Sequence, residues 1–375
     1  MTENFFSLNG NEVDFQPGET ILEAARRHGV VIPTLCHLEG TTPTGACRIC
    51  VVEVEGAATL MAACATPVSA GMRIKTESAR VVQTRRTLLE LLLASGNHTC
   101  AAGPTGAGSW TEAQMRAREL DGDALCPAWG DCKLQELAFQ YQAKPDRFVP
   151  APDAPPPELA NPMIERDFSR CIRCGRCLQA CNEVQVNRAI GFGYHGTQSK
   201  IVTAGDRPLA DSNCVFCGQC VQACPTGALV DKKSRDRWRS WEVEKIRTTC
   251  PYCGVGCQQW LHVRDGRIVR VTAVEDAQPN QGRLCVKGRY GYDFIYSEER
   301  LKTPLIREGD RFREASWDEA LDLVAGKCKQ IIAESGPNAL AGVSCARSIN
   351  EDSYNMQKLF RAVFKTNNID HCART

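Results

Sequence analysis

The chain has 375 residues with 45 basic against 44 acidic side chains, and this balance argues against nucleic acid as a main partner, because phosphate binding needs a net basic face. No apolar run reaches the roughly 18 residues that span a bilayer, and the N-terminus lacks the basic start and apolar core of a signal peptide. We therefore expect a cytoplasmic protein of several domains with no membrane span, whose 22 cysteines bind metals or clusters instead of forming disulfides.

Residues 4–78 predict a small mixed domain. The stretch FFSLNGNEVDF predicts two short strands around Asn9-Gly10, which is a strong hairpin signal. A short helix, GETILEAARRHG, should end at Gly29, and CRICVVEVEG should form a strand. Apolar residues at helical period then predict a helix over 79–95.

A proline-rich stretch separates this region from the rest of the chain. Residues 145–162 hold seven prolines, which is typical of a semi-rigid extended linker and not of a packed element. Two similar cysteine runs follow at 171–181 and 214–224 and form an internal repeat. Further on, a capping box of Ser316 and Glu319 predicts the start of a helix. The stretch NALAGVSC then predicts a buried strand, and NEDSYNMQKLFRAVFKTNN predicts a second helix.

The repeat carries the strongest chemical signal. Both runs, CIRCGRCLQAC and CVFCGQCVQACP, have the spacing C-x2-C-x2-C-x3-C of two-cluster bacterial ferredoxins. Three thiolates two residues apart can wrap three corners of an Fe4S4 cube, and the fourth thiolate binds the other cube. The alternative is a pair of zinc sites, although zinc prefers paired C-x2-C hooks that are far apart. The expected ligands are Cys171, Cys174, Cys177 and Cys224 for one cube, and Cys214, Cys217, Cys220 and Cys181 for the other.

The N-terminal domain carries a group of its own, formed by Cys36, Cys47, Cys50 and Cys64. A [2Fe–2S] cluster needs one ligand, a close pair and a distant fourth, and the plant form begins with C-x4-C-x2-C. Here ten residues separate the first two cysteines, so the plant form is not matched. The longer gap resembles the [2Fe–2S] domain in the large iron–sulfur subunit of respiratory complex I and its relatives. A buried thiol set or a zinc knuckle is the alternative.

A less regular group comprises His98, Cys100, Cys126 and Cys132. In relatives of complex I, a site of one histidine and three cysteines holds a [4Fe–4S] cube, and its last two cysteines are five residues apart, as they are here. The sequence departs from that pattern, because one residue follows the histidine where three are common, and 25 residues separate the next two cysteines where two are common. An inserted loop, 101–125, could still leave the ligands close in space, because loop length adds little closure entropy. The alternative is a surface histidine, with the cluster absent or without histidine.

The fourth group lies in CPYCGVGC and GRLCVKGRYGYDF and comprises Cys250, Cys253, Cys257 and Cys285. This spacing alone could hold zinc or a cube. The strand pair in between, QQWLHVRDGRIVRVTAVED, resembles the first domain of the molybdopterin oxidoreductases that carry a molybdenum or tungsten bis-guanylyl-dinucleotide cofactor. In that family, the lysine two residues after the last cysteine lies between cube and pterin. The resemblance therefore implies that Lys287 is an electron relay beside the cofactor, and the alternative is a solvated surface lysine.

Three cysteines stay without a role. Cys328, Cys345 and Cys372 have no ligand spacing, and Cys345 is expected to pack as a small buried apolar group.

In their order, these groups resemble the catalytic alpha subunit of cytoplasmic, NAD-linked formate dehydrogenases. The stretch SINEDSYNMQKLFRAVFKTNNIDHCAR also resembles that family's segment entering the active site. The resemblance implies that formate is oxidised to CO2 and that electrons pass through one [2Fe–2S] and four [4Fe–4S] clusters to a flavin- and NAD-binding partner subunit. One rival is a non-catalytic electron-transfer subunit of an NAD-reducing hydrogenase or diaphorase-type complex, which has no use for residues 250–375. The other is an iron–sulfur sensor, which needs only one cluster.

The expected fold is that of an α+β multidomain iron–sulfur protein. Its expected parts are a β-grasp [2Fe–2S] domain (1–78), a His-Cys [4Fe–4S] domain (79–144), the linker (145–162), a bacterial-type two-cluster ferredoxin domain (163–245), a small β-rich [4Fe–4S] molybdopterin-type domain (246–302) and an incomplete molybdopterin-binding α/β segment (303–375).

The C-terminal residues carry one more expectation. In the resembled family, DHCAR plus one residue leads to the chalcogen ligand of the metal, which is cysteine or selenocysteine. That ligand would follow Thr375, and selenocysteine is encoded by UGA, which is ordinarily read as stop. We therefore expect a selenocysteine formate dehydrogenase cut at its in-frame UGA, and we expect this chain alone to be inactive. A natural short protein or a chosen domain is the alternative.

Overall fold

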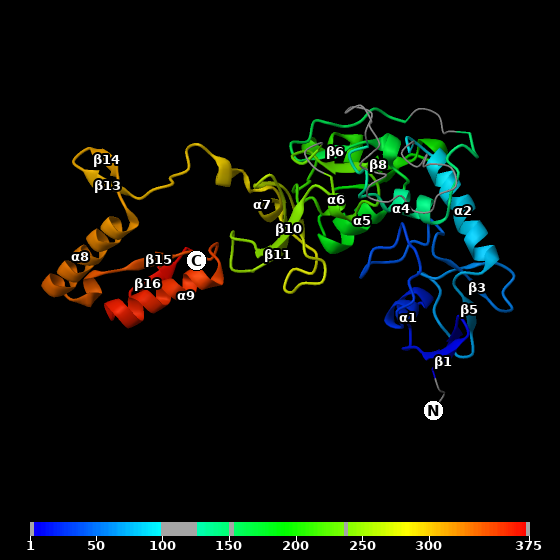
Figure 1. Ribbon diagram of the computed structural model, residues 1–375, viewed down its shortest axis with the longest axis horizontal. Coiled ribbons are helices and arrows are strands. Elements are labelled where there is room, and N and C mark those ends of the chain that lie inside the picture. The colour runs from blue at the N-terminus through cyan, green and yellow to red at the C-terminus, as the bar shows by residue number, and fades with distance from the viewer. Residues whose placement is uncertain (1–3, 99–125, 150–153, 236–238, 373–375) are drawn as a thin grey trace. The chain divides into compact units, whose positions relative to one another are not determined.

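The computed structural model describes residues 4–98, 126–149, 154–235 and 239–372 (Figure 1). The chain divides into two compact units, residues 1–243 and residues 244–375. Within the described ranges, no helix combines the length and the apolar character needed to cross a membrane.

The first unit begins with a five-stranded mixed sheet in the order β2-β1-β5-β3-β4. The predicted hairpin is confirmed, because Asn9 and Gly10 turn with φ of 53° and 90° between two antiparallel strands. β1 and β5 are parallel, and helix α1 buries Ile21 and Leu22 in the core that it shares with the sheet. The bounds are β1 Phe5–Leu8, β2 Asn11–Asp14, α1 Ile21–Arg27, β3 Val51–Val54, β4 Met61–Ala62 and β5 Arg73–Lys75.

Two helices extend this unit beyond the sheet. Helix α2 (Ala79–Ala94) confirms the helix predicted over 79–95, and Ser78 caps its start by accepting the N–H of Val81 at 3.3 Å. Helix α4 (Lys133–Gln140) shares with α2 a core that also contains Leu35 and Ile49 of the N-terminal domain. The N-terminal domain and both helices are thus packed neighbours, because their apolar side chains meet in one core.

Each of the two cysteine runs leads into a short helix, α5 or α6. The same stretch of chain also contains two antiparallel strand pairs, β6-β9 and β7-β8. Helix α5 continues directly into a π-helical turn, η4, which carries Cys181. The bounds are β6 Ile164–Arg166, η3 Phe168–Arg170, α5 Arg176–Gln179, η4 Ala180–Val184, β7 Gly191–Gly193, η5 Gly196–Gln198, β8 Lys200–Val202, η6 Ala204–Asp206, η7 Leu209–Asp211, α6 Gln219–Ala223 and β9 Leu229–Asp231.

Residues 145–162 were predicted to contain no packed element, and this prediction is wrong for residues 158–162. Glu158 exchanges both backbone hydrogen bonds with Arg166, at 2.8 and 3.1 Å, and its carboxylate forms an ion pair with the same residue. Asn161 is fully buried, and its Oδ1 accepts the N–H groups of Met163 and Ile164, each at 2.9 Å. The prolines disfavour helix, but the polar side chains next to them attach the end of this stretch to β6.

The second unit begins with an antiparallel sheet in the order β10-β11-β12. β11 and β12 confirm the predicted strand pair, and Asp265 and Gly266 turn between them with φ of 49° and 71°. β10 was not predicted, because its residues are almost all exposed and lack an apolar alternation. The bounds are β10 Glu244–Thr249, β11 Gln258–Arg264, β12 Arg267–Ala273, α7 Val286–Tyr290 and η8 Asp293–Tyr296.

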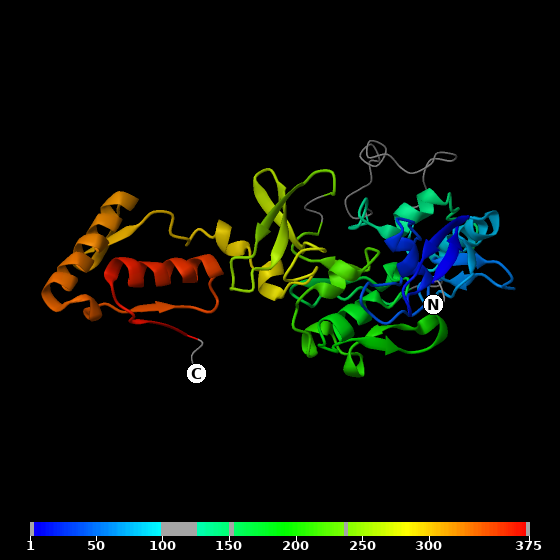
Figure 2. The ribbon, with the colours of Figure 1, turned by 90° about the horizontal axis from the view of Figure 1, so that it is seen from below.

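The rest of this unit holds a hairpin, two longer helices and a parallel strand pair, β15-β16, next to α9 (Figure 2). Both predicted helices are confirmed as α8 and α9. The predicted buried strand is wrong in its burial, because the side chain of Val343 in β15 is 77% exposed. The bounds are β13 Leu305–Glu308, β14 Arg311–Glu314, α8 Trp317–Ser335, η9 Pro337–Ala339, β15 Gly342–Ser344, α9 Asn350–Lys358, η10 Leu359–Phe364 and β16 Ile369–His371.

Candidate iron–sulfur sites

Four thiols of the N-terminal domain lie together in the loops around β3 and β4. Cys47 donates its backbone N–H to the Sγ of Cys36 at 3.5 Å, and Cys36, Cys50 and Cys64 are buried. Contact with Cys47 holds the pKa of Cys36 below its usual range, and contact with Cys64 lowers the pKa of Cys50 to about 7. This buried patch offers one early ligand, a close pair and a distant fourth, which is the donor set that a [2Fe–2S] cluster requires.

Arg85 fixes the close pair of this set from helix α2. Its side chain is fully buried, and its Nε and Nη2 donate to the carbonyl oxygens of Ile49 and Val51 at 2.9 and 2.8 Å. These two carbonyls flank Cys50. The rigid fork of the guanidinium thus holds the backbone on both sides of a proposed ligand. Sequence reasoning did not identify this residue.

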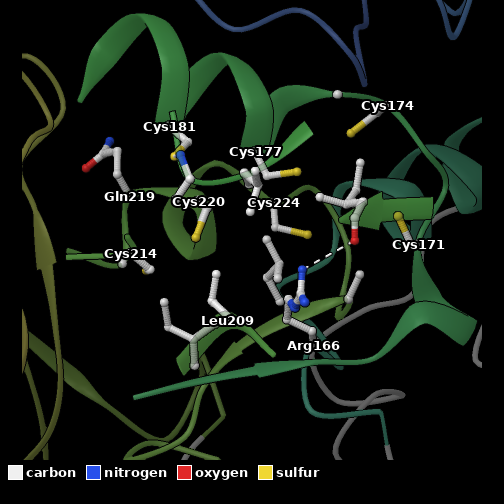
Figure 3. Close-up of a pocket in the computed structure, with 18 of the residues that line it drawn as sticks. Arg166, Cys171, Cys174, Cys177, Cys181, Leu209, Cys214, Gln219, Cys220 and Cys224 are labelled. Atoms are coloured by element: carbon white, nitrogen blue, oxygen red, sulfur yellow. Dashed lines mark hydrogen bonds between the residues drawn. The ribbon is translucent and has the colours of Figure 1, made fainter. Parts of the chain in front are cut away.

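The eight cysteines of the repeat line one apolar pocket. Figure 3 shows Cys171, Cys174, Cys177 and Cys224 on one side and Cys181, Cys214 and Cys220 on the other. Neighbouring thiols contribute within and between these two sides, since Cys224 raises the pKa of Cys171 and Cys174, whereas both Cys181 and Cys224 raise that of Cys220. In each case burial is the larger cause of the raised pKa. The labelled thiols thus lie on two sides of one pocket, and their assignment to two cubes stays a prediction.

The loops that present these thiols repeat the same backbone turn. Arg173 and Phe216, at matching positions of the two runs, have φ of 54° and 53°, and Gly175 and Gly218 follow with φ of 79° and 70°. Left-handed backbone at a bulky residue costs about 1–2 kcal/mol and persists only where the surroundings demand it. Its presence in both loops indicates that the turn serves to present the cysteines.

Burial makes these thiols poor candidates for a metal-free function. It raises the pKa of Cys174 to about 12 and is also the main cause of the raised pKa of Cys171, Cys177 and Cys220. Thiolates in such a place need a cationic partner, because an isolated buried charge is costly. Iron would supply that charge, so this donor set fits the clusters that the spacing predicts.

His98 and two cysteines of the irregular group lie alongside this pocket, and Cys100 lies outside the described residues. Gly227 lies against Cys126, since a β-carbon at this glycine would be 3.0 Å from the Cys126 Sγ, and Cys132 donates its thiol to the carbonyl of Pro225 at 3.5 Å. Residues 225–227 directly follow Cys224. Cys126 and Cys132 therefore lie next to the backbone that follows Cys224.

His98 itself is buried, with 6% of its surface exposed, so the alternative of a surface histidine is wrong. Among the described residues, no hydrogen-bond partner reaches its Nε2. Burial, aided by Arg170, lowers its pKa to about 4, which keeps the imidazole neutral near pH 7. A neutral imidazole with an orphaned buried nitrogen is suited to bind iron.

Replacing His98 with cysteine is expected to change the EPR signal of one cluster and to leave the others as they are, because a thiolate would take the place of the imidazole. The measurement is EPR of the dithionite-reduced protein, together with iron analysis. The exposed His195 provides the matched control, and His195→Cys should leave every signal unchanged. Identical spectra and iron contents for both variants would remove His98 from the ligands.

The second unit presents the fourth group around the start of helix α7. Cys250 and Cys257 are joined by a backbone hydrogen bond of 2.8 Å, and Cys285 is the N-cap residue of α7. Lys287 places its Nζ 5.6 Å from the ring centre of Tyr252, within cation–π range. Lys287 itself is exposed, so this cation–π contact is made at the surface, and the role of Lys287 as an electron relay stays a prediction.

No cysteine that the structure describes takes part in a disulfide. In the described part of the chain, no group of three histidine, cysteine, aspartate or glutamate side chains is arranged to hold a single metal ion.

Four family models match the chain in succession. They are a 2Fe-2S iron-sulfur cluster binding domain over residues 5–79, a 4Fe-4S dicluster domain over 170–228, a molybdopterin oxidoreductase Fe4S4 domain over 243–297 and a molybdopterin oxidoreductase over 300–375.

Curated relatives match almost the whole chain. The NADPH-Fe(3+) oxidoreductase subunit alpha of Geobacter sulfurreducens is 36% identical over 98% of this chain and 40% of its own length, and a subunit of the NADH-quinone oxidoreductase of Rhizobium meliloti is 34% identical over the same shares. The Bacillus subtilis protein named "Putative formate dehydrogenase YrhE" is 30% identical over 98% of this chain and 39% of its own length. The chain thus spans about 40% of the length of these relatives.

A solved structure matches as well. One chain of the NAD+-reducing [NiFe]-hydrogenase in its H2-reduced state is 32% identical, with a TM-score of 0.52, and the match covers 62% of this chain and 88% of that one.

Proposed function

Because this chain belongs to the molybdopterin oxidoreductase family and carries [2Fe–2S] and [4Fe–4S] domains, we propose that it is the electron-transferring part of a formate dehydrogenase alpha subunit. One observation carries the proposal. The same chain contains a pocket lined by the eight cysteines of the repeat and a segment, residues 300–375, that matches the molybdopterin oxidoreductase family model. The choice of formate is supported by the 30% identical relative named for formate and by the resemblance of residues 348–374 to the segment entering the active site.

The proposed cofactors are one [2Fe–2S] and four [4Fe–4S] clusters, which take up and release single electrons when bound. The chain would bury them, keep water away and set their potentials through hydrogen bonds to the sulfurs. The proposed ligands are Cys36, Cys47, Cys50 and Cys64 for the first, His98, Cys100, Cys126 and Cys132 for the second, the two sets of the repeat, and Cys250, Cys253, Cys257 and Cys285 for the last.

Hydrogen bonds between the segments that carry proposed ligands in the first unit support a continuous route. Gln179, on the helix between Cys177 and Cys181, donates its Nε2 to the carbonyl of Thr42 at 2.6 Å. Thr42 in turn donates its N–H to the Glu183 carboxylate at 2.8 Å. Thr42 belongs to the loop between the first two proposed [2Fe–2S] ligands, so this loop is joined to the helix that carries ligands of both cubes.

Lys287 is the proposed relay residue of the second unit, at the cube nearest to a pterin. Residues 300–375 would contribute to the site of a molybdenum or tungsten bis-guanylyl-dinucleotide cofactor, which supplies the chemistry of formate oxidation when bound. The carboxyl ends of β15 and β16 support this location, because open α/β sheets bind their ligands beyond the carboxyl ends of parallel strands.

A flavin- and NAD-binding iron–sulfur subunit is the proposed partner. Support comes from two relatives that are named as subunits, one of an NADPH-Fe(3+) oxidoreductase and one of an NADH-quinone oxidoreductase. The same relatives, with the matching hydrogenase chain, favour a second candidate, in which the protein transfers electrons without oxidising formate.

Formate should reduce the clusters of the full-length protein, purified without oxygen from cells supplied with molybdate or tungstate. The measurements are the loss of cluster absorbance after formate is added and the rate of formate-dependent dye reduction. In the comparison, NADH or NADPH replaces formate in the presence of the co-purified partner. Bleaching by a reduced nicotinamide but not by formate would favour the second candidate. Residues 1–375 alone should reduce no dye with formate, because helix α8 buries none of its residues and β15 pairs only with β16 among the described strands.

A further inference from the structure

Two cysteines outside all of the proposed cluster groups lie against each other in the second unit. The Sγ atoms of Cys345 and Cys372 are 3.3 Å apart, and Cys345 is only partly buried, which corrects the expectation that it packs as a small buried apolar group. We propose that this pair is a peroxide-sensitive dithiol that oxidises to a disulfide. The inference is independent of the substrate of the enzyme, because it depends only on these two side chains and their surroundings.

The strand pairing brings the two cysteines together. β15 and β16 are parallel neighbours, and their last residues, Ser344 and His371, lie opposite each other. Each cysteine directly follows the end of its strand. Neighbouring strands lie about 4.8 Å apart, and disulfides join α-carbons that are about 4.4–6.8 Å apart. The backbone is therefore already placed for a bridge, and only the two sulfurs have to approach.

The surroundings also favour the reactive form of one thiol. Cys372 is exposed, and its pKa is held below the usual value by the N–H of Ala346, by contact with Cys345 and, more weakly, by the charge of Arg347. The N–H of Arg347 donates to the Sγ of Cys345 at 3.4 Å. An accessible thiolate beside a second thiol is the arrangement found in redox-active cysteine pairs.

The oxidation proceeds in two steps with hydrogen peroxide as the oxidant. The Cys372 thiolate attacks one peroxide oxygen, the O–O bond breaks, and a sulfenic acid and hydroxide result. The sulfur of Cys345 then attacks the sulfenic sulfur, the S–O bond breaks, and water leaves as the disulfide forms. The two thiols lose two electrons and two protons in total, and one peroxide is reduced to two waters.

The test exposes the full-length, anaerobically purified protein to about one equivalent of hydrogen peroxide. Alkylation, digestion and mass spectrometry should then find the two cysteine peptides joined, with the mass of two hydrogens missing. Iron content is measured in the same sample, so that cysteines released by cluster damage are recognised. Recovery of Cys345 and Cys372 as separately alkylated peptides, with iron intact, would overturn the proposal.

Three variants sharpen this test. Cys345→Ser should leave a sulfenic acid on Cys372 that dimedone traps, because the resolving thiol is gone. Cys372→Ser should abolish both the bridge and the adduct. Cys328→Ser, on helix α8, is the matched control and should form the bridge like the wild type. Absence of a dimedone adduct in Cys345→Ser, or loss of the bridge in Cys328→Ser, would also count against the pair.

Discussion

Replacing Arg85 with methionine is expected to lower the free energy of unfolding of the first unit by about 3 kcal/mol, because buried carbonyl groups that lose their donors cost about 1–3 kcal/mol each. Arg85 is fully buried and donates to the carbonyls of Ile49 and Val51, to the hydroxyl of Tyr141 and to the carboxylate of Glu77. Methionine fills similar space but offers none of these donors. Anaerobic urea unfolding followed by circular dichroism measures the change.

Arg80, on the same helix, provides the matched control. Its side chain is exposed and donates to the carbonyl of Ala58 at 3.1 Å, so Arg80→Met should change stability by no more than about 0.5 kcal/mol. Arg85→Met should also alter the EPR signal of the [2Fe–2S] cluster, since the backbone around Cys50 loses its support. Equal unfolding midpoints and identical spectra for the two variants would contradict the role assigned to Arg85.

Removing the Cys224 thiol is expected to cost one [4Fe–4S] cluster, or about four iron atoms per chain. Its sulfur lies with those of Cys171, Cys174 and Cys177 and not with the run that contains it in the sequence (Figure 3). Cys224→Ala should therefore abolish the EPR signal of the cluster that the first run holds. Iron analysis and EPR of the reduced protein provide the measurement.

Double variants test this exchange of ligands between the runs. Cys171→Ala combined with Cys224→Ala should lose no more iron than either single variant, because both residues serve one cluster. Cys214→Ala combined with Cys224→Ala should lose about eight iron atoms, because two clusters are affected. Cys328→Ala should lose none. The reverse pattern of losses would show that each run holds its own cluster.

Sequence reasoning succeeded where structure depends on neighbours in the chain. The turn at Asn9-Gly10 and the helices over 79–94 and 317–335 follow from local propensity. The capping box predicted at Ser316 forms only by half, since Ser316 accepts the N–H of Glu319 while the Glu319 carboxylate pairs with Arg313. A complete box occurs instead at Thr20 and Glu23, which the sequence reasoning did not single out.

The features that were missed depend on contacts between distant residues. Arg85 lies at helical spacing between the buried Val81 and Leu89, which is a signal that a charged residue faces the core, but its acceptors lie 34 and 36 positions away. The contact of Cys345 with Cys372 likewise spans 27 positions and follows only from the parallel pairing of β15 and β16. Local patterns cannot determine such pairings, because they are set by tertiary packing.

The metal content of this chain, purified and reconstituted without oxygen, tests the central claim most directly. Five clusters require about 18 iron atoms per chain, with a matching amount of acid-labile sulfide and no stoichiometric zinc. The measurement combines elemental analysis with EPR of the reduced protein. About 18 iron atoms and the signals of one [2Fe–2S] and four [4Fe–4S] clusters are the expected result. About ten iron atoms, or stoichiometric zinc, would contradict the account.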